Sequence, residues 1–222
     1  MRILQQLTTH PKFQETFLLG LMTAFCFGLS LFRVFFTQTN VFLFLNWNLF
    51  LAFVPWVVSS VVILYPRLQT KKSVIGLMLF SWLLFFPNAP YILTDLFHLR
   101  LKTAMPIWYD LVLILSFAWT GLLFGLLSLW DIEKILKKTV SGKWTALMSV
   151  VFLFAGSFGI YIGRYLRWNS WDIITEPMGI VMDIAHRFAF PMEHPRTWGM
   201  TLFLGLLLNM IYWSMRMIQR RA

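Results

Sequence analysis

Two short segments of the chain carry an aspartate followed three positions later by a histidine: Asp95 with His98, and Asp183 with His186. On a helix each pair shares one face, and a carboxylate with an imidazole suits zinc, iron or manganese. If the two pairs meet, they could hold one divalent metal ion, or act without metal as an acid and a base. The alternative is that each aspartate orients its own histidine or pairs with a nearby arginine, since so short a motif often arises by chance.

The first pair lies in a polar stretch, residues 86–99, that Pro87 and Pro90 interrupt. The prolines free backbone groups that hydrocarbon cannot satisfy, so we expect this stretch in a protein-lined or wet place. A helix starting at Pro90, with Asn88 near its cap, would present a polar face. That face would consist of Tyr91, Asp95, His98 and Lys102.

A second polar cluster contains Arg164 and Arg167, which share a face at helical spacing. Together with Arg33 they could clamp a phosphate or carboxylate headgroup. The alternative, which we favour, is a girdle at the membrane interface in which arginines pair with Asp110 and Asp172, because unpaired charge at membrane depth is costly. The residues expected to bind a ligand are therefore Asn88, Tyr91, Asp110, Arg164, Arg167, Asn169 and Asp172.

These residues are embedded in a very apolar chain. Hydrophobic residues make up 59% of the sequence and charged residues only 13%, and the mean hydropathy is +0.70. Soluble domains carry about a quarter charged residues, so the composition indicates an integral membrane protein. We expect a single all-α membrane domain over residues 1–222, a bundle of about six transmembrane helices. The expected spans are about 17–36, 47–65, 73–87, 107–130, 144–163 and 198–215.

Segments between the spans should position the polar residues. The third span is short, so it either tilts little or is completed by the proline-containing stretch as a re-entrant or interfacial helix. Helical segments near 90–101 and 180–189 are expected to roof a polar pocket, whereas 131–143 reads as a charged loop. The fifth span carries a small-residue face, typical of close helix packing, at Ala155, Gly159 and Gly163.

The distribution of positive charge predicts the orientation. The net charge is +10, and Lys and Arg concentrate in alternate loops and at both ends of the chain. The positive-inside rule then places both termini in the cytoplasm and the histidine-bearing segments on the extracytoplasmic face. We attribute this charge to orientation and lipid headgroups rather than to nucleic acid. Cys26 is the only cysteine, which excludes an internal disulfide and a thiolate metal cluster.

Two runs resemble the signatures of a bacterial membrane-protein family catalogued as domain of unknown function 1361. The first is WLLFFPNAPYILTDL at residues 82–96, followed by His98, and the second is GRYLRWNSWD at residues 163–172. The resemblance extends from the second span to the last. It implies a multi-pass protein of a bacterial plasma membrane and implies no activity.

Several functions fit these patterns. The first is the binding or processing of an outer-leaflet lipid or a small polar ligand in an Asp/His/Arg pocket. A second is a metal-dependent hydrolase or transferase, with Asp95, His98, Asp183 and His186 as ligands or proton carriers. A transporter would need polar residues through the whole bundle, and the spans offer few. A structural or assembly partner would use the polar roof as an interface.

Overall fold

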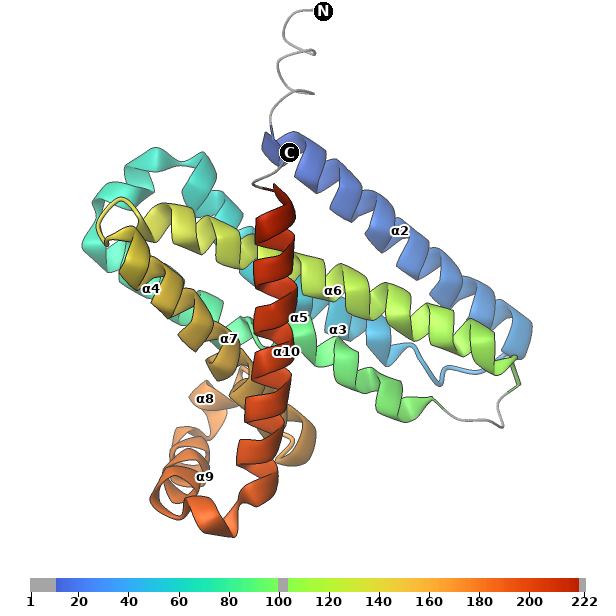
Figure 1. Cartoon of the computed structure of the whole chain (residues 1–222). Helices are drawn as coiled ribbons and strands as arrows, with labels where there is room; N and C mark the ends of the chain where they lie inside the picture. Colours follow the sequence, from blue (N-terminus) through green and yellow to red (C-terminus); the bar gives the residue numbers. More distant parts are fainter. Residues whose placement is uncertain (1–10, 100–103, 220–222) are drawn as a thin grey trace, which may run out of the picture.

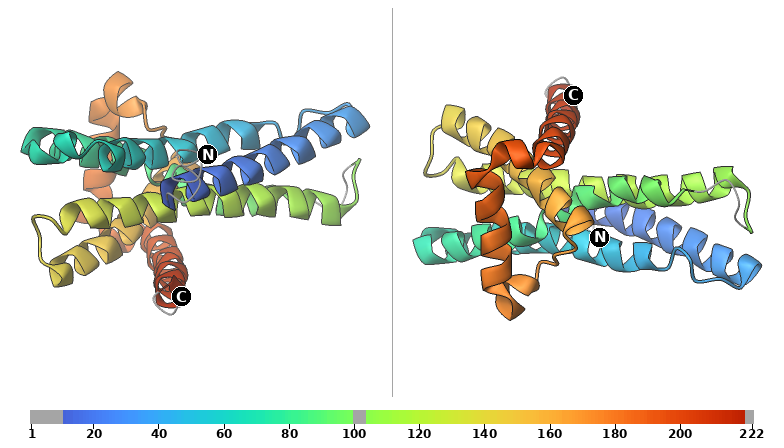
Figure 2. Two further views of the ribbon diagram at one scale, coloured as in Figure 1. Left: turned by 90° about the horizontal axis from the view of Figure 1, so that it is seen from above. Right: turned by 90° about the horizontal axis from the view of Figure 1, so that it is seen from below.

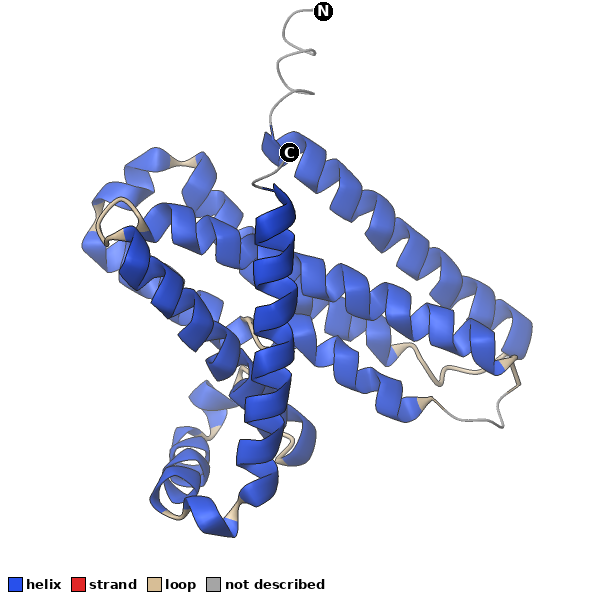
Figure 3. Ribbon diagram, viewed as in Figure 1, coloured by secondary structure: helices blue, strands red, loops and turns tan. Residues whose placement is uncertain are grey.

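The computed structural model describes residues 11–99 and 104–219, and within these ranges the regular elements are helices and no strand occurs. Six helical runs are long and apolar enough to cross a membrane, which confirms the all-α prediction (Figure 3). Their bounds are α2 Pro11–Thr37, α3 Phe44–Leu64, the composite run Lys72–His98, α6 Ile107–Leu136, α7 Gly142–Tyr165 and α10 Pro195–Gln219. The short η1 helix (Pro66–Thr70) joins α3 to the composite run.

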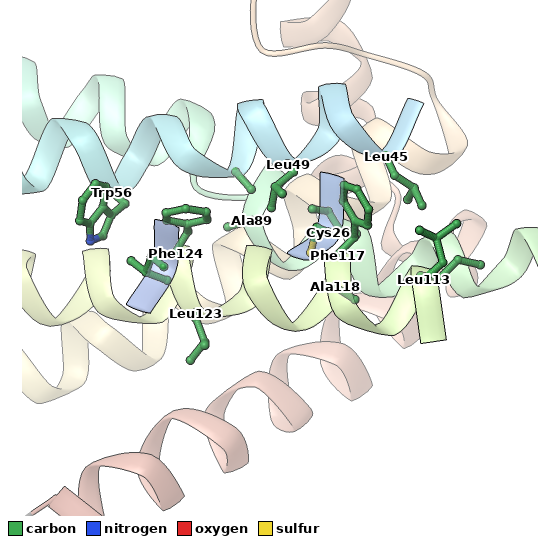
Figure 4. Close-up of a cluster of buried hydrophobic side chains, with 14 of the residues drawn as sticks. Cys26, Leu45, Leu49, Trp56, Ala89, Leu113, Phe117, Ala118, Leu123 and Phe124 are labelled. Atoms are coloured by element: carbon green, nitrogen blue, oxygen red, sulfur yellow. The ribbon is translucent and has the colours of Figure 1, made fainter. Parts of the chain in front are cut away.

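Helix α6 is the centre of the fold. It is the most extensively buried of the six membrane-length helices, and α2 and α3 pack along it, as Figure 1 shows. Figure 4 shows the resulting core, in which Leu45 of α3 lies beside Leu113 of α6, and Leu49 of α3 and Cys26 of α2 lie beside Phe117 of α6. A helix this apolar is stable in contact with either protein or lipid, and for α6 the contacts are mainly with the other helices.

Helices α7 and α10 form a second group that crosses the first at a steep angle (Figures 1 and 2). Their contact depends on a small residue, since a Cβ atom placed on Gly205 would lie 2.3 Å from the ring of Phe154. Close approach at a glycine is a common device in membrane helix pairs. After α7, the chain forms α8 (Asp172–Thr175), α9 (Pro177–Ala189) and η3 (Pro191–Glu193) before it enters α10.

The proline-containing stretch completes the third membrane-length run. Helix α4 (Lys72–Phe85) gives way to α5 (Asn88–Tyr91) and then to the 3₁₀ helix η2 (Ile92–His98). The predicted end at residue 87 was therefore too early. Of the predicted polar face, Tyr91 and Asp95 both contact Arg164, and the three residues per turn of η2 put His98 on one face with Asp95 and Ile92. Lys102, the fourth member of that face, lies outside the described residues.

Side chains satisfy the backbone that the break exposes. Asn88 does not cap a helix, because the N-cap position is Pro87. Its Nδ2 instead donates to the carbonyl oxygen of Phe85 at 3.0 Å. The hydroxyl of Ser170 donates to the carbonyl oxygen of Leu84 at 2.9 Å. The break thus lies inside protein, as the cost of unsatisfied backbone in a membrane requires.

Glycines of two helices enclose this break. A Cβ atom on Gly125 of α6 would lie 2.8 Å from the Cβ of Ala89, and one on Gly159 of α7 would lie 2.5 Å from the ring of Pro87. The small-residue face predicted for the fifth span is therefore a packing face, and its partner at Gly159 is the proline break. Only residues without side chains permit this approach, so the two helices fix the position of α5.

Helices α2, α6 and α10 extend beyond the spans that we expected. The predicted charged loop over 131–143 is wrong for its first half, because α6 continues to Leu136 and buries Asp131 and Glu133. Both carboxylates meet cations from other helices: Lys12 of α2 pairs with Asp131, and Arg216 of α10 pairs with Glu133 at 2.5 Å. Because the pairs neutralise the charge, the helices can continue past the apolar runs.

Candidate functional site

A cavity of about 430 Å³ lies among α3, α4, α5 and α7, next to α8 and α9. Its wall is mostly aliphatic and aromatic, and the described residues that line it include no Asp, Glu, Lys, Arg or His. Neutral polar side chains enter the wall from α3, α5 and the segment after α7: Asn48, Asn88, Tyr91, Asn169 and Ser170. A cavity of this size and composition is typical of small-molecule and lipid sites.

The rim of the cavity faces outward through apolar side chains. Trp47 of α3 and Phe80 of α4 line the cavity and are 54% and 56% exposed, and Trp171 is 38% exposed. The rings of Trp47 and Trp171 lie 6.4 Å apart, edge to face. Because Trp47 and Phe80 belong to membrane-length runs, the opening is aromatic where a bilayer would meet it.

A buried ion pair supports the polar part of this wall from behind. Asp95 is 1% exposed; it accepts hydrogen bonds from Arg164 Nη2 at 2.5 Å and from Asn48 Nδ2 at 2.8 Å. Arg164 also donates to the hydroxyl of Thr94 and stacks on the ring of Tyr91 at 4.4 Å. The pair therefore holds Asn48 and Tyr91 in place, although neither charged group lines the cavity.

The loop after α7 is tied to the helix break by a second set of bonds. Asn88 Nδ2 donates to Ser170 Oγ at 3.0 Å, and this hydrogen bond joins two parts of the cavity wall that are 82 residues apart in the sequence. Asp172 accepts from the backbone N–H of Asn169 at 2.6 Å and closes the turn before α8. Of these residues, Asn88 and Asn169 were predicted ligand contacts and do line the cavity, whereas Asp172 stabilises the loop.

The predicted arginine clamp does not form. Arg33 is buried and pairs with Asp110, with Nε 2.7 Å from Oδ1, as the ion-pair alternative predicted for Asp110. Arg164 turns inward to Asp95. Arg167 is exposed and adopts a left-handed backbone conformation with φ of 63°. This conformation terminates α7 and lets the next backbone N–H, that of Trp168, donate to the carbonyl oxygen of Ile162 at 3.4 Å.

The two Asp-x-x-His pairs do not converge on one metal site. His98 approaches its own Asp95, with Nδ1 3.9 Å from the carboxylate. Asp183 accepts from Trp168 Nε1 at 2.7 Å and pairs with Arg187 at 3.1 Å. Each aspartate thus pairs with an arginine, as the alternative reading held.

The described residues contain a different group of potential metal ligands. His186, Glu193 and His194 each offer one ligand atom, and these atoms all lie within 4.8 Å of one another. Glu193 and His194 were not among the predicted site residues. A signal was present in the sequence, because Glu193 and His194 lie between Pro191 and Pro195, shortly after His186.

A second missed feature is the buried polar network at the other end of α6. Glu133 Oε1 accepts from Ser149 of α7 at 2.6 Å and from Tyr212 and Arg216 of α10 at 2.7 and 2.5 Å. Asp131 accepts from Lys12 of α2 and from Ser59 of α3. These two acids, which are separated by one residue, therefore connect α6 to four other helices, which is a structural role.

Six membrane-length helices, of which α6 is the most buried, with a cavity among them, are the architecture of α-helical membrane proteins. Residues 47–211 match the family model described as a protein of unknown function, DUF1361. The chain belongs to this family, as its two signature runs indicated. Comparisons with curated proteins and with solved structures gave no match. The residues that line the cavity, from Trp47 to Ile184, all fall within the matched region.

Proposed function

We propose that the cavity binds an amphiphilic ligand, either a membrane lipid of the outer leaflet or a small polar molecule with an apolar body. The observation that carries this proposal is the rim: Trp47 and Phe80 line the cavity and are also exposed on membrane-length helices. A ligand dissolved in the bilayer could enter through such a rim without crossing water. An ion or a strongly polar solute would lose its hydration at this rim and would find few hydrogen-bonding or charged groups to replace it.

The polar groups of the wall favour a neutral or hydrogen-bonding headgroup. Asn48, Asn88 and Ser170 offer amide and hydroxyl groups on one side of an otherwise apolar cavity. A few such groups in an apolar wall fix the orientation of a ligand, while the apolar area supplies most of the affinity. Hydroxyl, amide, ester and sugar groups match these partners.

Binding is a better proposal than catalysis for this site. Hydrolysis or group transfer needs an acid, a base or a metal ligand against the reacting atoms. Three carboxylates lie behind lining residues, and each is already engaged. Asp95 accepts from Asn48 and Arg164, Asp172 accepts from Asn169, and Asp183 accepts from Trp168 and pairs with Arg187. The ion pair thus serves as a support for the wall.

The setting that we propose is a bacterial plasma membrane with both termini in the cytoplasm. The end of α6 that carries Lys134 and Lys137 also meets Lys12 and Arg216, so the positive charge of several helices gathers there. The cavity lies toward the opposite ends of α3 and α7, near Asn48 and Ile162. The positive-inside rule supports the proposal that the cavity lies in the extracytoplasmic half.

Photolabelling of the full-length protein in proteoliposomes tests the proposal. The probe is diacylglycerol, whose headgroup is a neutral hydroxyl, with a diazirine on one acyl chain, and labelled peptides are identified by mass spectrometry. We expect labelling concentrated on peptides that contain Trp47 and Trp171. Ala155→Phe adds a ring to the cavity wall and should remove most of it. Val151→Phe, on the same helix at a position that is 54% exposed, should not.

A second cavity variant, Leu51→Trp from the facing helix, guards against a folding defect in the first. Unfolding curves in detergent establish that each variant is folded. The proposal is refuted if folded Ala155→Phe and Leu51→Trp proteins are labelled at these peptides as strongly as the parent. It is also refuted if labelling spreads evenly over all exposed apolar faces.

A further inference from the structure

The turn between α9 and α10 brings together two histidines and a glutamate. His186 lies in the last turn of α9, Glu193 ends η3, and His194 directly precedes α10. Backbone hydrogen bonds set this turn: the N–H of Phe190 donates to His186 at 2.9 Å, and the N–H of His194 donates to Pro191 at 3.2 Å. The backbone geometry therefore exists before any ligand binds.

The ligand atoms of the three side chains converge. Each side chain offers one atom within 4.8 Å of the other two, and His186 Nδ1 lies 2.8 Å from His194 Nε2. In a tetrahedral zinc site with bonds of about 2.0–2.1 Å, neighbouring ligand atoms lie about 3.3 Å apart. A shift of about half an ångström would bring the two nitrogens to that separation, and exposed side chains such as His186 and Glu193 can move this far. We propose that His186, Glu193 and His194 bind a zinc ion.

The donor set selects the kind of metal. Imidazole nitrogens favour zinc and neighbouring transition metals over magnesium and calcium, which prefer sites made entirely of oxygen. Two histidines and a glutamate are a known zinc ligand set that leaves a fourth position open to water. This proposal does not depend on lipid binding in the cavity.

The charges around the turn permit a cation. Glu193 has no ion-pair partner among the described residues, so its carboxylate is not engaged by an arginine. The two nearest arginines in the sequence are occupied elsewhere: Arg187 pairs with Asp183 at 3.1 Å, and Arg196 stacks on the ring of Tyr165 at 5.7 Å. Zinc would therefore meet a net negative ligand set.

A bound zinc ion would join the end of α9 to the start of α10. Beneath the turn, Phe188 of α9 packs edge to face on Trp198 of α10, with centroids 5.0 Å apart. Upstream on the same helix, Ile180 and Ile184 line the cavity. The ion would thus hold α9 against the bundle and fix that part of the cavity wall.

Zinc binding is measured on detergent-purified full-length protein, first stripped with a chelator, by competition with a chromophoric zinc indicator. We expect one Zn²⁺ per chain, and no competition from Mg²⁺ in excess. His186→Gln and His194→Gln should each weaken binding by about 100-fold or more, because loss of an outer-shell partner alone costs about 10–100-fold. His98→Gln is the matched control and should bind zinc as the parent does.

Two further variants separate loss of a ligand from loss of structure. His194→Cys retains a zinc ligand and should restore much of the affinity that His194→Gln loses. Glu193→Gln should weaken binding as well, since a neutral amide is a poorer ligand than a carboxylate. The proposal is overturned if the parent binds no stoichiometric zinc, or if His98→Gln lowers the affinity as much as His186→Gln does.

Discussion

Replacing Arg164 by methionine should destabilise the protein through the buried carboxylate that it leaves behind. Arg164 donates to Asp95 at 2.5 Å and to Thr94 Oγ1 at 2.9 and 2.7 Å, and its side chain is 14% exposed. Methionine keeps an unbranched apolar side chain but removes all three bonds. Asp95, at 1% exposure, would keep the hydrogen bond from Asn48 and the more distant His98, whose Nδ1 lies 3.9 Å away.

The expected magnitude follows from which group stays buried. Removing one partner of a buried pair costs about 3–5 kcal/mol, whereas replacing both by apolar residues is often nearly neutral. Arg164→Met should therefore lower the free energy of unfolding by about 3–5 kcal/mol. Asp95→Leu should fall near the lower end of that range, because Arg164 keeps Thr94 and the ring of Tyr91 and is partly exposed. The double variant should lie within about 2 kcal/mol of the parent.

The assay is reversible unfolding by titration of SDS into dodecylmaltoside micelles, followed by far-UV circular dichroism. Arg167→Met is the control, since Arg167 is exposed and lies three residues away; its effect should stay within about 0.5 kcal/mol. The two single changes should couple by about 2 kcal/mol or more in the double variant. Single effects below about 1 kcal/mol, or strict additivity, would refute the role that we assign to the pair.

Three other predictions follow from the packing. Glu133→Gln should cost about 2–4 kcal/mol in the same assay, because it removes the carboxylate that pairs α10 with α6, whereas the exposed Glu176→Gln should be near neutral. Gly159→Ala should cost about 1–3 kcal/mol, since the new methyl group meets a proline ring at 2.5 Å; Gly76→Ala, with open space around it, should be neutral or stabilising by up to about 1 kcal/mol. A Thr139→Cys variant should react with a membrane-impermeant maleimide only after cell lysis, whereas a Glu176→Cys variant should react in intact cells. The native cysteine is buried and should give a low background. The reverse pattern of labelling would contradict the proposed orientation.

The charged groups within the helices show where reasoning from sequence was sufficient. The rule that charge at membrane depth must be paired predicted partners for Asp110 and for the arginines, and Arg33 is the partner of Asp110. The same rule was not applied to Asp131 and Glu133, which read as loop residues because they follow the apolar run. Their partners Lys12 and Arg216 come from opposite ends of the chain, so no local sequence pattern predicts these ion pairs.

The cavity shows where such reasoning stopped. Asn88, Tyr91 and Asn169 were expected to contact a ligand and line the cavity, but Asn48 and Trp47 were missed. A single asparagine in an apolar helix gives no indication of the direction it faces. The rotation of α3 about its axis is set by packing against α6, and that packing depends on many residues together.

The sequence by itself determined the number of membrane-length runs and their helical type. In hydrocarbon the backbone must satisfy its own hydrogen bonds, so long apolar runs become helices, and a run broken at Pro87 and Pro90 must be covered by protein. Only the tertiary structure decided which polar groups meet. Asp95 and Arg164 are 69 residues apart, and their contact depends on glycine faces that let helices approach the break. Such approach is a property of several helices at once, and spacing along one of them does not contain it.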